Sequence, residues 1–298
     1  MTAAQWLMLA LKASIVLIVV PVGLMGTLQD ATSLLRRPGA LLRSMVAMNV
    51  LMPVLAVLLA LSFALDPVVK VALIALSVSP MPPFLPKKAA KAGGEGGYTV
   101  GLLVAASVLS LVLVPVAMSL IGRIFHIEVS VPIGKIVGIV VTTVLAPLAF
   151  GLVVRRLAPN LAERAAHPVS VAAGVLLVGS ALPLLVVSWP AMKTLIGNGT
   201  LAAMVVFAVA GVVAGHFLGG PREDERVVLA MATGSRHPAV AIALGTAYFA
   251  DSKQLIAAVL LYLVVCTIAV APYLGWRRRH LADTRKLIEE RHHEQARA

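Results

Sequence analysis

Nine runs of apolar residues, each about as long as a lipid bilayer requires, restrict what this chain can fold into. A helix that crosses the hydrocarbon core needs about 20 predominantly apolar residues. Such runs occupy residues 5–26, 40–63, 68–86, 99–122, 135–154, 169–188, 200–218, 225–249 and 255–275. Because 60% of the residues are hydrophobic and only 13% are charged, the chain has the composition of an integral membrane protein. We predict an all-α polytopic membrane protein with about nine transmembrane helices.

The lysines and arginines predict the orientation of the chain. Eighteen of the 25 fall in alternate connections and in the C-terminal segment, six lie on the opposite side, and Arg236 remains at membrane depth. The basic connections are residues 27–43, 87–98, 155–168, 219–226 and 276–298. Basic residues accumulate on the cytoplasmic side of membrane proteins. We therefore expect a multi-pass protein of the cell (inner) membrane with its N-terminus outside and its C-terminus in the cytoplasm. The net charge of +12 then needs no nucleic-acid partner.

The predicted transmembrane domain spans residues 1–275, with a first half at 1–122 and a second half at 123–275. A basic cytoplasmic tail follows at 276–298. The tail is compatible with a short amphipathic helix on the inner leaflet or with a solvated, frayed end. A single cysteine, Cys266, excludes disulfides and multi-cysteine metal sites, and the sequence predicts no metal site or cofactor.

Two of the apolar runs contain helix breakers near their middle. The third reads "VALIALSVSPMPPFLPKKAAKAGGEGGY", with four prolines between residues 80 and 86, and the eighth reads "RVVLAMATGSRHPAVAIALGTAYF". Proline removes a backbone donor and opposes the preceding turn, so each helix is predicted to break. The two runs are five spans apart and enter the membrane in opposite directions. Paired broken helices in an inverted repeat point to a transporter binding site at the bilayer midplane.

The residues beside the two breaks favour an anionic ligand. A helix start exposes unpaired N–H groups and the positive end of the helix dipole. We expect Ser79 to cap the helix after the first break, and Thr233 or Ser235 to cap the helix after the second. Arginine binds carboxylates in a bidentate manner, so a carboxylate is a suitable ligand. The candidate substrate-binding residues are Ser79, Pro82, Lys87, Thr233, Ser235, Arg236 and His237.

Two roles for Arg236 remain open at this stage. Its guanidinium can receive an anionic group of the substrate, or it can pair with Glu95, and the two arrangements can alternate during transport. His237 is expected to be a neutral hydrogen-bonding group, because the adjacent arginine disfavours its protonation. Lys87 either contacts substrate or anchors the cytoplasmic end of the third span.

Three segments carry a resemblance to a known family. They are "VGLMGTLQDATSLLRRPGALLRSMVAMNVLMPVLA", the proline-rich stretch after Ser79, and "GHFLGGPREDERVVLAMATGSRHPAVAIALGTAYF". In this order and spacing the chain resembles the bile acid:sodium symporter family, which includes bacterial organic-anion transporters. The resemblance implies a core with two crossed, broken helices and a smaller panel of helices that rocks against it. Some members have nine spans.

The ion-site residues of sodium-coupled members are altered here. The resemblance places a Ser-Asn pair on Leu85 and Pro86, and the pattern E-x-G-x-Q-N on residues 232–237, where this chain has Ala232 and Arg236. Sodium needs several hard oxygen ligands, which these side chains do not supply, so sodium coupling does not carry over. Sodium remains possible only through other groups. The candidate ion or coupling residues are Asn49, Glu95 and Thr99.

The sequence thus predicts a secondary active transporter of a small organic anion that works by alternating access. The alternative is a membrane receptor or sensor that binds an anion and moves nothing. An enzyme is not expected, because protease-like Ser/His or paired-Asp arrangements within the spans are missing. The partners are the substrate and the bilayer, and the sequence leaves the oligomeric state open.

Overall fold

A computed structural model describes residues 3–125, 131–246 and 252–295. This part of the chain forms helices and their connections and contains no strand, so the predicted all-α fold is confirmed. The helical segments are α1 (Ala3–Met25), α2 (Leu28–Ser33), α3 (Pro38–Val46), η1 (Ala47–Leu51), α4 (Met52–Ser62), α5 (Pro67–Val78), α6 (Leu85–Lys91), α7 (Gly96–Phe125), α8 (Ile133–Val140), η2 (Val141–Leu145), α9 (Ala146–Leu157), α10 (Pro159–Thr194), α11 (Thr200–Leu218), α12 (Glu223–Gly234), α13 (Pro238–Gly245) and α14 (Ser252–Gln295). The last residues of the predicted run 225–249 and of the tail lie outside the described residues.

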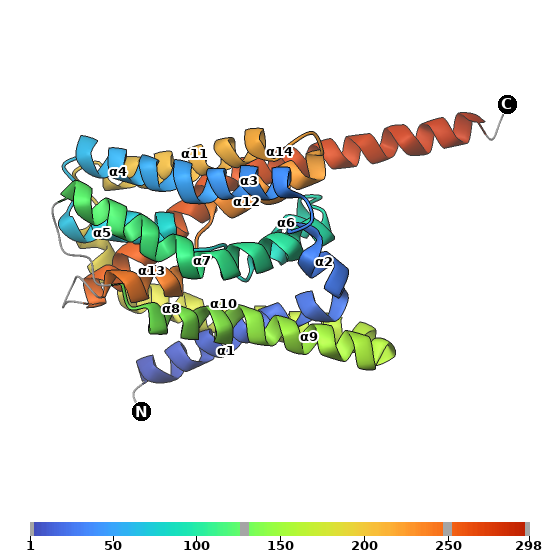
Figure 1. Cartoon of the computed structure of the whole chain (residues 1–298), viewed down its shortest axis with the longest axis horizontal. Helices are drawn as coiled ribbons and strands as arrows, with labels where there is room; N and C mark the ends of the chain where they lie inside the picture. Colours follow the sequence, from blue (N-terminus) through green and yellow to red (C-terminus); the bar gives the residue numbers. More distant parts are fainter. Residues whose placement is uncertain (1–2, 126–130, 247–251, 296–298) are drawn as a thin grey trace.

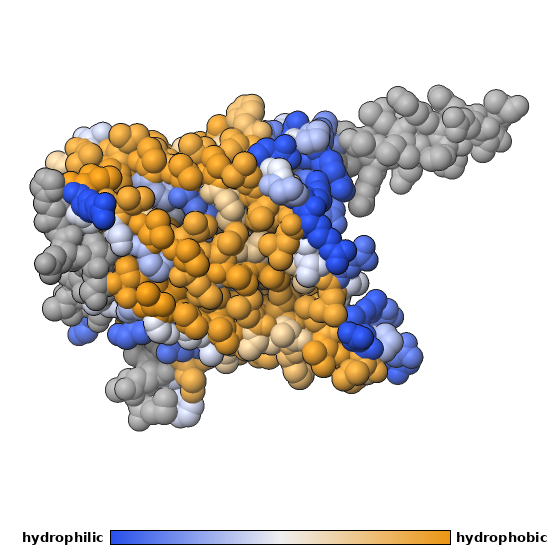
Figure 2. Space-filling model, viewed as in Figure 1, coloured by the Kyte–Doolittle hydropathy of each residue, from blue (hydrophilic) through white to orange (hydrophobic). Residues whose placement is uncertain are grey.

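Seven helices of the described chain are long and apolar enough to cross a membrane. Two shorter apolar helices, Leu9–Met25 and Pro67–Val78, add to them, while the total of nine spans stays a prediction. Figure 2 shows hydrophobic side chains over most of the visible face, with hydrophilic ones gathered toward the end from which α14 extends. This surface fits a multi-pass membrane protein.

The helices form two groups that pack mainly within themselves. A panel group consists of α1, α8, η2, α9 and α10, in which α1 lies against both α9 and α10. The core group contains the two broken helices, α5–α6 and α12–α13, together with α3, η1, α4, α7, α11 and α14. In Figure 1 the panel group lies below the core group.

Glycines allow the closest helix contacts in each group. A Cβ atom added to Gly151 of α9 would lie 2.8 Å from the Gly23 Cα atom of α1. In the core, a Cβ atom added to Gly211 would lie 2.8 Å from the Gly234 Cα atom, and one on Gly215 would lie 2.6 Å from the Ala230 Cα atom. Small residues let transmembrane backbones approach in this way.

The last helix corrects the expectation of a separate short helix in the C-terminal tail. Helix α14 continues without interruption from Ser252 to Gln295. Residues 276–295 therefore continue the last helix and do not begin a separate short one, while their contact with the inner leaflet or with solvent stays a prediction.

The two broken helices run in opposite directions. In Figure 1, α5 and α6 follow each other from left to right, whereas α12 and α13 follow each other from right to left. Accordingly α5 packs on α13, and α6 packs on α12. Helix α12 has twelve residues, about 18 Å of helix, so its end reaches about halfway through a 30 Å hydrocarbon core.

Candidate functional site

The first break covers residues 79–84, between α5 and α6. Ser79 has extended backbone angles, and its hydroxyl donates to the Ala75 carbonyl oxygen at 2.6 Å. The hydroxyl thus closes the end of α5. Helix α6 begins instead after Phe84, which makes no side-chain capping bond. The expectation that Ser79 caps the helix after the first break is wrong, because the five residues 80–84 separate Ser79 from the start of α6.

The second break covers residues 235–237, between α12 and α13. Ser235 and His237 are extended, and Pro238 occupies the first turn of α13. The hydroxyl of Thr233 donates to the Leu229 carbonyl oxygen at 2.8 Å, while the Ser235 hydroxyl lies 3.9 Å from the Cys266 Sγ atom. Neither caps α13, whose N-cap residue is His237, so this expectation is also wrong.

The two breaks are hydrogen-bonded to each other. The His237 backbone N–H donates to the Pro80 carbonyl oxygen at 2.9 Å, and the Arg236 Nη1 atom donates to the Ser79 carbonyl oxygen at 3.2 Å. Both Arg236 and His237 are 0% exposed. We call residues 79–84 and 235–237 together the crossing. The sequence-based prediction that two opposed breaks meet inside the protein is confirmed.

A third element, η1, completes the surroundings of Arg236. Its Nη2 atom donates to the Met48 carbonyl oxygen at 2.8 Å. Residue Met48 lies in a π-helical segment, where a carbonyl accepts from the residue five positions later. That residue is Pro53, which has no N–H. The Met48 oxygen is therefore free to accept from the guanidinium.

The panel group approaches the crossing through a second π-helical segment. The Thr143 Oγ1 atom of η2 lies 3.3 Å from the His237 Nε2 atom. The spacing repeats that of η1, since Pro147 follows Thr143 by four residues as Pro53 follows Asn49. The Arg236 Nε and His237 Nδ1 atoms are buried and have no hydrogen-bond partner among the described residues.

Glu95 does not pair with Arg236, so that alternative is wrong for this conformation. Its carboxylate accepts from the backbone N–H groups of Gly97, at 2.7 Å, and of Tyr98, and so caps the start of α7. Arg236 makes no ion pair with any carboxylate that the structure describes. Among the described residues, its hydrogen-bond acceptors are the Ser79 and Met48 backbone oxygens.

The polar atoms of Thr99, Asn49 and Lys87 have partners outside the crossing. Thr99 donates its hydroxyl to the Glu95 carbonyl oxygen at 2.6 Å. Asn49 directs its side-chain nitrogen to the Met45 Sδ atom at 3.4 Å. Lys87 reaches the panel group, where its Nζ atom donates to the Ser170 carbonyl oxygen of α10 at 3.1 Å. Pro82 is buried in the first break.

These positions do not form a sodium site. Sodium is bound by several hard oxygens, and the crossing offers no carboxylate. The two carbonyl oxygens described above, of Ser79 and Met48, already accept from Arg236. Glu95 and Thr99 are occupied at the start of α7. The residues present therefore do not fit a bound sodium ion.

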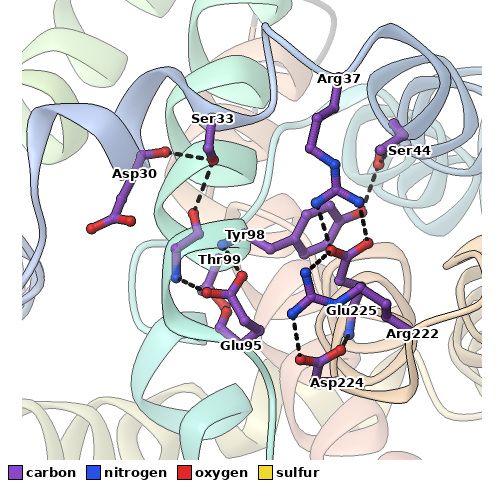
Figure 3. A network of polar contacts seen from close by, with 12 residues as sticks. Asp30, Ser33, Arg37, Ser44, Glu95, Tyr98, Thr99, Arg222, Asp224 and Glu225 are labelled. Carbon is purple, nitrogen blue, oxygen red and sulfur yellow. Dashed lines mark hydrogen bonds and ion pairs between the residues drawn. The ribbon is translucent and has the colours of Figure 1, made fainter.

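A polar network at the end of the core group escaped the sequence-based prediction. Arg37 binds the Glu225 carboxylate through both terminal nitrogens, at 2.6 and 3.1 Å, and Arg222 approaches the same carboxylate at 3.4 Å (Figure 3). The hydrogen bond that Arg37 donates to the Glu225 carboxylate raises the pKa of Arg37 above its ordinary value. Beside it, the hydroxyls of Ser44 and Tyr98 are 2.8 Å apart. The network joins the connection before α3 to α7 and α12.

Comparison with known proteins identifies the family. No curated protein matches the chain. A model of the Sodium Bile acid symporter family matches residues 13–188, which is more than half of the chain and includes the first break. The chain therefore belongs to the Sodium Bile acid symporter family, a family of membrane transporters.

Proposed function

We propose that this protein is a secondary active transporter that moves a small organic anion by alternating access. Family membership supports transport as the general activity. The observation that supports an anionic substrate is the buried charge of Arg236, which no described carboxylate neutralises. Each break brings together one helix C-terminus and one helix N-terminus, so the helix dipoles largely cancel and the charge of the guanidinium remains.

A buried donor at the crossing fits the same proposal. The Arg236 Nε–H group has no partner among the described residues, and a buried polar atom without a partner costs about 1–3 kcal/mol. A carboxylate that reached the crossing would accept a hydrogen bond from it. Because Thr143 and Lys87 connect the crossing to the panel group, movement of that group would alter access to it. The excess of basic residues in alternate connections supports an inner-membrane protein with a cytoplasmic C-terminus.

Ligand screening of the purified protein tests this proposal. We expect carboxylates, from pyruvate to cholate, to include some that raise the unfolding temperature, while the amide of the same molecule has no effect. A ligand at a hundred times its Kd stabilises the folded state by about 2.7 kcal/mol. The same carboxylate should enter proteoliposomes that contain the protein. Specific binding without uptake would support a receptor, and the absence of any carboxylate-specific stabilisation would refute the anion site.

The variant Arg236→Gln tests the role of the charge. Glutamine can still donate to backbone oxygens but is neutral, so we expect the carboxylate to bind at least about tenfold more weakly, a loss of about 1.4 kcal/mol. Arg155→Gln is the matched control, because Arg155 pairs with the exposed Glu163 on the panel group. Equal carboxylate affinity of Arg236→Gln and Arg155→Gln would contradict the proposed role.

A further inference from the structure

The surroundings of Arg236 resemble those of a bound cation. Its guanidinium contacts backbone oxygens from two different elements, Ser79 after α5 and Met48 in η1, at 3.2 and 2.8 Å. It also lies directly after α12. The negative end of α12 lies on one side of it and the positive end of α13 on the other, so these two dipoles largely cancel and the carbonyl oxygens supply the attraction. In transporters with broken helices, helix C-terminal ends and unwound carbonyls are the groups that coordinate a coupling cation.

Prolines leave both of these oxygens available. In a continued helix the Ser79 carbonyl would accept from the residue three or four positions later, but these residues are Pro82 and Pro83, which lack an N–H. The Met48 carbonyl likewise lacks its π-helical donor, because that residue is Pro53. The sequence thus creates two unpaired carbonyls at one place and supplies the cation that occupies them.

We propose that the Arg236 guanidinium is a resident cation, held between the two broken helices by the Ser79 and Met48 carbonyls in place of a mobile coupling ion. Since the oxygens are already engaged and the site already carries a positive charge, a sodium ion has neither ligands nor electrostatic attraction there. Folding and transport consequently do not require sodium. The consequence for coupling rests on the proposed function, whereas the cation site does not depend on any substrate.

The wild-type protein tests the proposal without any substitution. Its thermal unfolding is measured in detergent with sodium, potassium or choline chloride at equal ionic strength. We expect the same unfolding temperature in all three salts. A saturable stabilisation by sodium alone would overturn the proposal. This measurement stands even if a variant at Arg236 does not fold.

Chemical rescue of Arg236→Ala tests the site directly. We expect this variant to unfold at a lower temperature than the wild type, and guanidinium chloride at low millimolar concentration to raise that temperature by several degrees. Urea is neutral and similar in shape, so it should give no rescue at the same concentration. Phe207→Ala removes another fully buried large side chain of the core group and should respond to neither compound. Equal rescue by urea, or equal rescue of Phe207→Ala, would disprove a cation site.

The two proposals can fail separately. Loss of the resident cation proposal would appear as sodium-dependent stability in a protein that still binds carboxylates. Failure of the proposed function would appear as a protein that binds no carboxylate, although guanidinium still rescues Arg236→Ala.

Discussion

The contact between α1 and α9 offers a quantitative test of how the panel group is built. In Gly151→Ala the new methyl group would lie 2.8 Å from the Gly23 Cα atom and 2.8 Å from the Leu24 nitrogen. Carbon atoms pack at about 3.5–4.0 Å, so α1 would have to retreat by roughly 1 Å along its contact with α9. Overpacking of this kind costs about 1–3 kcal/mol.

Gly138→Ala is the matched control, because Gly138 lies in the same membrane-spanning segment. Nothing lies within 4 Å of a Cβ atom added there. Alanine should therefore stabilise the helix, by up to about 1 kcal/mol, through the lower conformational freedom of the unfolded chain. At about 2–4 °C per kcal/mol, Gly151→Ala should unfold several degrees below the wild type and Gly138→Ala slightly above it.

Thermal unfolding of the three purified proteins in one detergent measures this difference. The reasoning requires the two alanine variants to shift in opposite directions. If Gly151→Ala were as stable as Gly138→Ala, the two backbones would not be in contact, and the described packing of the panel group would be wrong.

Two further predictions concern polar contacts of the core group. Glu225→Gln should lower the free energy of unfolding by about 2 kcal/mol, because the carboxylate is 1% exposed and accepts from charged donors, whereas Glu163→Gln in an exposed pair should change it by less than about 1 kcal/mol. Equal unfolding temperatures for the two variants would exclude a stabilising role for the buried carboxylate. Lys87→Ala should change the rate of uptake in proteoliposomes with little effect on carboxylate affinity, because the lysine contacts the panel group; Lys91→Ala, an exposed neighbour, should leave both unchanged. A large loss of affinity in Lys87→Ala would instead identify Lys87 as a substrate ligand.

The sequence was sufficient to predict the helical membrane fold and the two breaks, because prolines and long apolar runs act locally. It was not sufficient to predict which groups accept hydrogen bonds from the buried Arg236 guanidinium. The sequence left a substrate anion and Glu95 as its partners, whereas in the structure the guanidinium donates to the Ser79 and Met48 carbonyl oxygens, which tertiary packing brings together at the crossing. The Glu95 carboxylate instead accepts from backbone N–H groups two and three residues later, at the start of α7.

A polar residue four positions before a proline was a sequence signal for two other positions beside the crossing. Asn49, a candidate coupling residue, lies four residues before Pro53. The same spacing before Pro147 would have identified Thr143, whose hydroxyl lies beside His237. The pairing of Arg37 with Glu225 had no such signal, since 188 residues separate the two.

The hydrogen bonds inside the crossing also decide which parts of the molecule can separate. His237 and Arg236 donate hydrogen bonds to the first break and so hold the two broken helices, α5–α6 and α12–α13, together. Toward the panel group, in the described chain, the crossing and its following helix α6 offer two side-chain hydrogen bonds, from His237 to Thr143 and from Lys87 to Ser170. A typical hydrogen bond contributes only about 1 kcal/mol net. In the proposed alternating access, the panel group would therefore separate from the crossing, while the hydrogen bonds inside the crossing would stay intact.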